Sequence, residues 1–159
     1  MTTTQITWID ENTFTIEVEK VNRNRPAQKA ISATGRKMWL IDSVVANMPL
    51  GVGEKTKMVF FRIGLDVSNA DLEKEYKLRE LKSDPIAAAA VNEADPAFAD
   101  KYSNATLWKD TDGEYCFTSF HSHPGERCVN VRRNGNGWSD YWWFSGVPEK
   151  QLNPEVVAA

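Results

Sequence analysis

Alternation of apolar and polar residues marks most of the strands in this sequence. Residues 13–19 alternate strictly, which is typical of a half-buried strand, and residues 5–9 are predicted to form a strand before it. Residues 57–66 are rich in β-branched and aromatic residues and predict a buried central strand. Between these segments, apolar residues recur at helical spacing in residues 37–48, and we predict a helix there.

Helix signals concentrate in the middle of the chain. Ser68 is followed three residues later by Asp71, which is the order of a helix-capping box. Two Asp-Pro pairs follow, at residues 84–85 and 95–96. In such a pair Asp caps the helix, and Pro occupies the first turn, where its missing N–H removes no hydrogen bond. These signals predict three consecutive helices within about residues 69–103.

The last third of the chain predicts four short strands at residues 105–109, 114–122, 127–133 and 138–145. Turn-forming residues separate them, including Pro124-Gly125 and a run of alternating Asn and Gly at residues 134–137. The predicted fold class is therefore α+β, an antiparallel sheet with a C-terminal four-stranded meander and a helical insert (about residues 69–103) packed on it. We predict one domain over residues 1–148 and a loosely ordered tail over residues 149–159.

Composition fits a globular protein with an ordinary core: 159 residues, 42% apolar and 26% charged, with a net charge of −3. No apolar run approaches the roughly 18 residues that cross a bilayer, so we expect no membrane partner. The N-terminus lacks a basic region followed by an apolar block, which predicts a cytoplasmic, intracellular protein. Two cysteines make no disulfide framework, and we expect both to be thiols.

Positive charge is concentrated near the N-terminus. Residues 20–37 hold six basic residues and no acid. Such a segment either attracts anions or is an ordinary solvated surface, and both interpretations stay open. The candidate residues of this basic loop are Arg23, Arg25, Lys29, Arg36 and Lys37.

The two histidines of the chain, His121 and His123, lie in a predicted strand, where a His-x-His spacing puts both rings on one face. If Pro124-Gly125 is a two-residue loop, Glu126 faces His123 and Cys128 faces His121. Imidazole, thiolate and carboxylate are all ligands of first-row metals, so these four residues are a candidate zinc site. A longer loop would shift the pairing, and polar residues on the solvent face of a hairpin need no metal.

The segment His121-Ser122-His123-Pro124 resembles the His-Ser-His-Pro signature of JAMM-type zinc metalloproteases, which cleave isopeptide bonds. In that family the two histidines hold zinc, a Ser-x-x-Asp follows, and an upstream Glu activates water. The resemblance covers four residues, and no Ser-x-x-Asp follows at the required distance. It implies at most a zinc-dependent hydrolase that uses the His121-x-His123 pair. No other catalytic set or glycine-rich phosphate motif is present.

Large rings on both faces of residues 138–145 give a second candidate. Exposed rings beside guanidinium groups stack on bases or anchor a protein partner. Alternatively, the predicted helices of residues 69–103 cover one face and bury the rings. The candidate partner-binding residues are Trp138, Tyr141, Trp142, Trp143, Arg127, Arg132 and Arg133.

These observations favour a non-catalytic binding protein that uses the aromatic and arginine surface of the meander. The expected partner is a protein or a single-stranded nucleic acid, and we expect no cofactor. The alternatives are a zinc-dependent hydrolase with zinc at the histidine pair, and a structural or accessory component of a larger assembly.

Overall fold

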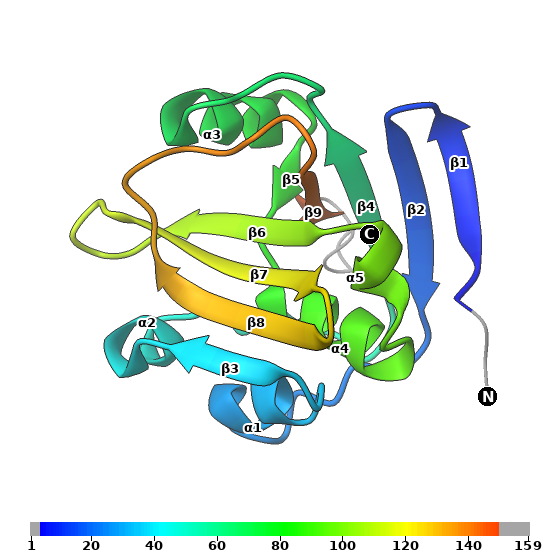
Figure 1. The fold of residues 1–159 in the computed structure, drawn as a ribbon, viewed down its shortest axis with the longest axis vertical. Coiled ribbons are helices and arrows are strands. Elements are labelled where there is room, and N and C mark those ends of the chain that lie inside the picture. The colour runs from blue at the N-terminus through cyan, green and yellow to red at the C-terminus, as the bar shows by residue number, and fades with distance from the viewer. Residues whose placement is uncertain (1–3, 150–159) are drawn as a thin grey trace, which may run out of the picture.

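The computed structural model describes residues 4–149, whose strands and helices are labelled in Figure 1. The strands are β1 (Ile6–Asp10), β2 (Thr13–Val18), β3 (Lys37–Leu40), β4 (Thr56–Arg62), β5 (Leu81–Lys82), β6 (Asn104–Lys109), β7 (Tyr115–His123), β8 (Glu126–Arg133) and β9 (Trp143–Pro148). The helices are α1 (Ala27–Ser32), α2 (Asp42–Ala46), α3 (Asn69–Leu78), α4 (Pro85–Ala94) and α5 (Phe98–Lys101). None of these helices has the length and apolar character that crossing a bilayer requires. The predicted tail falls almost wholly on residues 150–159, outside the described part of the chain.

The fold is mixed α+β with one nine-stranded, mostly antiparallel sheet, as the sequence predicted in outline. The strand order is β1-β2-β4-β9-β6-β7-β8-β3, and β5 pairs with β9. Two pairings are parallel, β3 with β8 and β6 with β9. Short turns join the antiparallel pairs β1-β2, β6-β7 and β7-β8, whereas the other antiparallel pairs and both parallel pairs join segments far apart in the sequence.

The prediction of a four-stranded meander was wrong in its last strand. Strands β6, β7 and β8 do form a meander, but β9 lies between β4 and β6 and begins only at Trp143. Residues before it are tied to another part of the chain, because the backbones of Val67 and Trp138 exchange two hydrogen bonds of 3.0 and 2.8 Å. The segment that leaves β8 therefore crosses to the start of α3 before it enters the sheet.

The prediction of a helix over residues 37–48 was also wrong in its first part. Residues 37–40 are strand β3, and the helix α2 starts only at Asp42. Strand β3 pairs in parallel with β8, with Lys37 opposite Cys128 and Leu40 opposite Val131. This partner strand lies about ninety residues away, so the local spacing of apolar residues did not reveal it.

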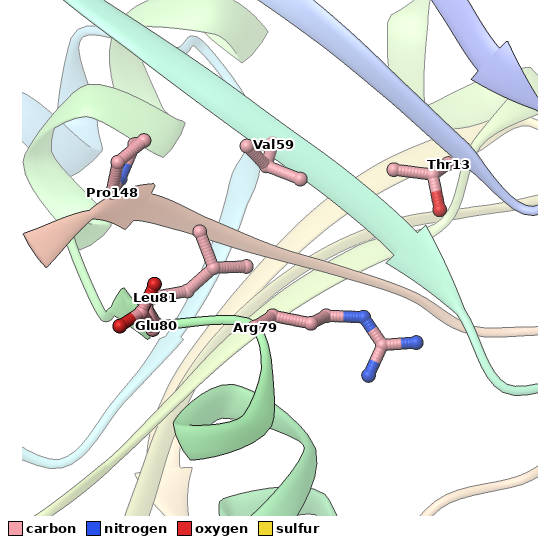
Figure 2. Close-up of a pocket in the computed structure, with 6 residues that line it drawn as sticks. All are labelled: Thr13, Val59, Arg79, Glu80, Leu81 and Pro148. Atoms are coloured by element: carbon pink, nitrogen blue, oxygen red, sulfur yellow. The ribbon is translucent and has the colours of Figure 1, made fainter.

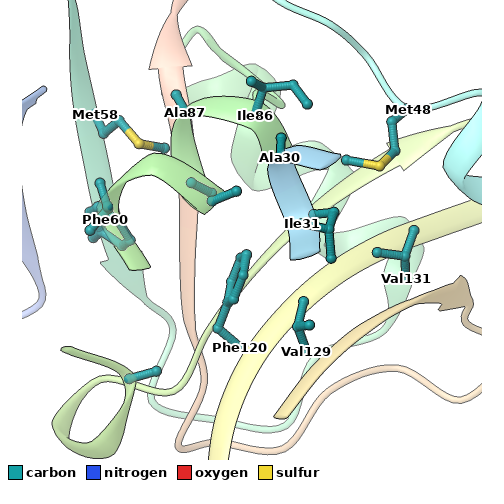
Figure 3. Packing of buried hydrophobic residues seen from close by; sticks show 14 of the residues in the cluster. Ala30, Ile31, Met48, Met58, Phe60, Ile86, Ala87, Phe120, Val129 and Val131 are labelled. Atoms are coloured by element: carbon teal, nitrogen blue, oxygen red, sulfur yellow. The ribbon is translucent and has the colours of Figure 1, made fainter. Parts of the chain in front are cut away.

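Apolar side chains pack on both faces of the sheet. On one face, α1, α2, α4 and α5 bury a cluster that includes Ile31, Phe60 and Phe120 (Figure 3). On the other face, α3 packs Leu72 and Tyr76 against a smaller cluster. The helical insert predicted at residues 69–103 is therefore divided between the two faces and does not pack on the sheet as one unit.

Helix α4 begins at a buried ion pair. Asp84 caps the helix, since its Oδ1 accepts from the backbone N of Ala87 at 3.1 Å. Both carboxylate oxygens also accept from Arg23, at 3.0 and 2.8 Å. Arg23 donates further to the carbonyls of Gly53 and Leu50, so it joins three segments of the chain. At Gly51, whose φ is +64°, an added Cβ would lie 2.6 Å from Oδ2 of Asp84, and only glycine fits there.

Candidate functional site

The β7–β8 hairpin places the two histidines and one cysteine on a single face of the sheet. The turn is a two-residue loop, one of the two alternatives that the sequence left open, and it places His123 opposite Glu126 and His121 opposite Cys128. Because neighbouring strand residues alternate between faces, Cys116 lies on the opposite face from His121 and Cys128. Both cysteines are free thiols.

The ligand-type atoms of this hairpin converge. The Nε2 atoms of His121 and His123 lie 3.3 Å apart. One donor atom from each histidine and the Sγ of Cys128 all lie within 4.8 Å of one another. Glu126 is adjacent, with its Oε1 at 3.5 Å from that Sγ and its Oε2 at 3.5 Å from Nζ of Lys37. The four residues of the predicted metal site thus occupy one small region.

Burial shifts the pKa values of His121 and Cys128. Desolvation, followed by the neighbouring charges of His123 and Arg36, lowers the pKa of His121, which favours a neutral imidazole. Desolvation, followed by the hydrogen bond to Glu126, raises the pKa of the Cys128 thiol. Two cations oppose this second effect, since Lys37 and Arg36 both favour the thiolate. These pKa shifts favour a neutral imidazole at His121 beside a protonated thiol at Cys128.

Three aromatic side chains border the histidines. The ring of Trp142 lies 6.1 Å from that of His121, edge to face, and stacks on Tyr141 at 5.4 Å. On the other side, β3 brings Trp39, with Lys37 positioned 5.0 Å above its ring. Trp39 is 49% exposed and Tyr141 is 59% exposed. Rings from two distant segments of the chain therefore lie beside one hairpin.

Asn69, at the start of α3, holds the segment that carries Tyr141 and Trp142. Its Oδ1 accepts from the indole N of Trp138 at 3.0 Å, and its Nδ2 donates to the carbonyl of Asn134 at 2.7 Å. Trp138 packs edge to face against Trp142 at 5.3 Å. The buried indole thus positions the more exposed one.

We call this surface the open face. A shallow pocket of about 380 Å³ forms its floor between β3, β7 and β8. The open face comprises Trp39, His121, His123, Glu126, Cys128, Asn130, Arg132, Tyr141 and Trp142.

The predicted partner-binding residues have different surroundings. Trp138 and Trp143 are 8% and 6% exposed, so their rings belong to the core. Arg127 pairs with Asp100, and Arg133 pairs with Asp110 and Glu114. Tyr141, Trp142 and Arg132 remain on the open face. Within the described part of the chain, no ion pair or side-chain hydrogen bond is found for Arg132.

Most cationic side chains of the basic loop are paired with carboxylates of the same chain or buried. Arg23 and Arg25 pair with Asp84 and Glu93, and Lys37 pairs with Glu126. Arg36 is only 6% exposed, and its three guanidinium nitrogens have no hydrogen-bond partner among the described residues. Lys29 is exposed on α1. These five residues therefore do not form one cationic surface.

Asp100 gives a pH-dependent contribution to stability near this region. It accepts from both Nε and Nη2 of Arg127, at 3.1 and 2.7 Å, and from the hydroxyl of Ser122. The Arg127 hydrogen bond, followed by that of Ser122, holds the pKa of Asp100 below its usual 3.8. The stability it contributes is thus fully present above the unfolded-state pKa and is lost as pH falls through the lower, folded-state pKa.

We therefore expect Asp100→Asn to weaken the acid dependence of the free energy of unfolding below about pH 4. Denaturant titrations at a series of acidic pH values measure this slope. Arg127→Leu removes the main cause of the shift and should weaken the slope in the same way. A wild-type slope that neither variant changes would contradict the assignment to Asp100.

A second pocket, of about 310 Å³, lies between β4, β5 and β9 (Figure 2), strands that do not line the open face. Its charged lining residues are Arg79 and Glu80. The guanidinium of Arg79 stacks on Phe61 at 4.2 Å and pairs with Glu75. Since this arginine has a packing role, the pocket offers less chemistry than the open face.

Sequence reasoning missed Trp39 and Asn130 as site residues. Trp39 was assigned to a helix, although Trp itself favours strands. Asn130 lies in the predicted strand over residues 127–133, but nothing in the sequence distinguished it from other polar residues. The open face combines metal-type donors with exposed rings and one guanidinium group. Comparison with family models, with curated proteins and with solved structures finds no match for this chain.

Proposed function

We propose that this chain is a non-catalytic binding protein whose open face docks a protein partner. The partner segment presents apolar side chains that cover Trp39 and Tyr141, and a carboxylate that pairs with Arg132. The single observation that carries the proposal is that exposed Trp39 and Arg132, an arginine with no ion pair among residues 4–149, line one shallow pocket, with the exposed Tyr141 stacked on Trp142 beside it.

The residue types support a protein interface. Trp, Tyr and Arg are the side chains most often found at energetic hot spots, because they offer a large contact area with few rotatable bonds or a planar hydrogen-bonding fork. Trp142 is partly covered by its neighbours, and both Trp138 and Tyr141 support its ring. A supported ring loses little entropy on binding.

The charges favour a protein over a single-stranded nucleic acid. Backbone phosphates are bound by several cations along a groove. Here Arg127, Arg133 and Lys37 are already paired with carboxylates, and Glu126 adds negative charge to the open face. One unpaired guanidinium suits one carboxylate better than it suits a run of phosphates.

Selection of displayed random peptides on the immobilised protein tests this proposal. We expect the selected peptides to combine apolar residues with Asp or Glu. Trp39→Ala should weaken their binding by about 2 kcal/mol, or roughly 30-fold. Arg132→Glu should also weaken binding and should shift selection towards basic peptides. Lys29→Glu, a charge reversal on α1, which packs on the opposite face of the sheet, serves as the matched control and should change neither.

Three results would contradict the proposal. Peptides whose affinity is unchanged by Trp39→Ala and Arg132→Glu would place the binding site elsewhere. Tight binding of single-stranded oligonucleotides, with affinity that falls steeply with salt, would identify a nucleic acid as the partner instead. Dimerisation that Trp39→Ala abolishes would mean that a second copy of the chain covers the open face.

A further inference from the structure

We infer that His121, His123 and Cys128 form a binding site for one Zn²⁺ ion at the floor of the open face. This inference goes beyond the proposed function, because the ion would be held by the hairpin alone, whether or not a partner is present. The ligand set differs from that of the metalloprotease signature, since the third ligand is a thiolate on the neighbouring strand.

The distance between the imidazoles matches a tetrahedral centre. Two nitrogens bound at about 2.0–2.1 Å to one tetrahedral ion lie about 3.3 Å apart. The Nε2 atoms of His121 and His123 lie 3.3 Å apart. The other ring nitrogen of His121, Nδ1, is buried, so Nε2 is the atom available to a ligand. The hairpin therefore holds two donors at the separation that the ion requires.

Cys128 completes a mixed nitrogen and sulfur set. Its Sγ and the histidine donors lie within 4.8 Å of one another, compared with about 3.6 Å for a nitrogen and a sulfur on one tetrahedral zinc. His123 is exposed, so its ring has room to rotate towards the sulfur. Imidazole with thiolate favours borderline-soft cations such as Zn²⁺ over Mg²⁺ or Ca²⁺, which prefer oxygen ligands.

The backbone around the three ligands is regular, and this reduces the entropy lost on binding. All three ligands lie in paired strands on either side of a two-residue turn. The fourth coordination position faces the shallow pocket, where Glu126 or water can occupy it. A site of three protein ligands with one open position is typical of zinc centres that exchange their fourth ligand.

Metal analysis of the full-length chain tests the inference. After saturation with Zn²⁺ and dialysis against metal-free buffer, we expect one zinc per chain. Replacement by Co²⁺ should give the visible absorption of a tetrahedral ion together with a thiolate-to-cobalt charge-transfer band. The band reports the sulfur ligand directly, so it separates this site from adventitious binding by histidines alone.

The two cysteines of the chain provide a matched pair of variants. Cys128→Ser should abolish the charge-transfer band, while Cys116→Ala, on the opposite face, should keep it. His123→Ala, at an exposed position, should lower zinc affinity by at least about 100-fold. Circular dichroism of each variant confirms that it is folded.

Loss of the band in Cys116→Ala but not in Cys128→Ser would overturn the inference. So would zinc affinity that folded His123→Ala leaves unchanged, or the absence of bound zinc in the wild-type chain. In the last case the short distance between the two imidazoles reflects only a hydrogen bond between them. None of these outcomes bears on peptide binding by Trp39 and Arg132, so the two proposals fail separately.

Discussion

Asp84→Ala is expected to lower the free energy of unfolding by about 4–6 kcal/mol. The substitution removes the cap of α4 and leaves the guanidinium of Arg23 without its carboxylate in a site where the two side chains are 14% and 2% exposed. Loss of one partner from a buried pair costs about 3–5 kcal/mol, and loss of a helix cap adds about 1 kcal/mol. Denaturant titration measures the change, which approaches the whole stability of a typical domain.

Glu93→Ala provides the control for this substitution. Glu93 also pairs with an arginine, since its Oε1 lies 2.6 Å from Nη2 of Arg25, but its side chain is 38% exposed. We expect a loss below about 1 kcal/mol, as for other exposed pairs. Equal effects of Asp84→Ala and Glu93→Ala would contradict the structural role given to Asp84.

Phe14→Ala is expected to cost about 3–5 kcal/mol. Phe14 is fully buried, and its ring lies between four others that join β2 to β4, β9 and the end of α5. Its centroid is 5.0 Å from Phe60, 4.9 Å from Trp143 and 5.0 Å from Tyr102, and a fifth ring, Trp8 of β1, lies at 5.0 Å. Truncation removes these contacts and leaves a cavity that fixed strands cannot close.

Two further variants provide controls for the loss of stability expected in Phe14→Ala. Phe14→Leu keeps most of the volume and should cost about 1.5 kcal/mol. Leu65→Ala removes a side chain that is 70% exposed and should change the free energy of unfolding by less than about 0.5 kcal/mol. A loss below 1 kcal/mol for Phe14→Ala would mean that this aromatic cluster is loosely packed.

Local signals in the sequence identified the parts of the fold that local physics determines. Ser68 and Asp84 were predicted as helix caps, and their side chains do accept from the backbone N of Asp71 and Ala87. The tight turn at Pro124-Gly125 fixed the register of the β7–β8 hairpin, and with it the face that carries His121 and Cys128. Each of these features depends on residues within a few positions of one another.

The missed features depend on contacts between distant residues. The segment that includes Trp39 has apolar residues at helical spacing, and only its pairing with β8 makes it a strand. Likewise, large rings fall on both faces of the predicted strand over residues 138–145, so its sequence did not tell which rings are buried. Asn69 holds Trp138 in a loop, and β4 and β6 bury Trp143. The candidate site was thus predicted at the hairpin, and Tyr141 and Trp142 were predicted as contact residues, but Trp39 was not.

The parallel pairing of β3 with β8 has a practical consequence for ligand screening. A molecule on the open face would touch Trp39, from the first third of the chain, and Arg132 and Tyr141, from the last third. Such a molecule bridges the edge strand β3 to segments from the other end of the chain, a surface that the unfolded chain does not present. Its binding should therefore raise the free energy of unfolding, by about 2.7 kcal/mol when its concentration is 100 times its Kd. A rise in Tm should reveal occupancy of this face even before any partner is identified.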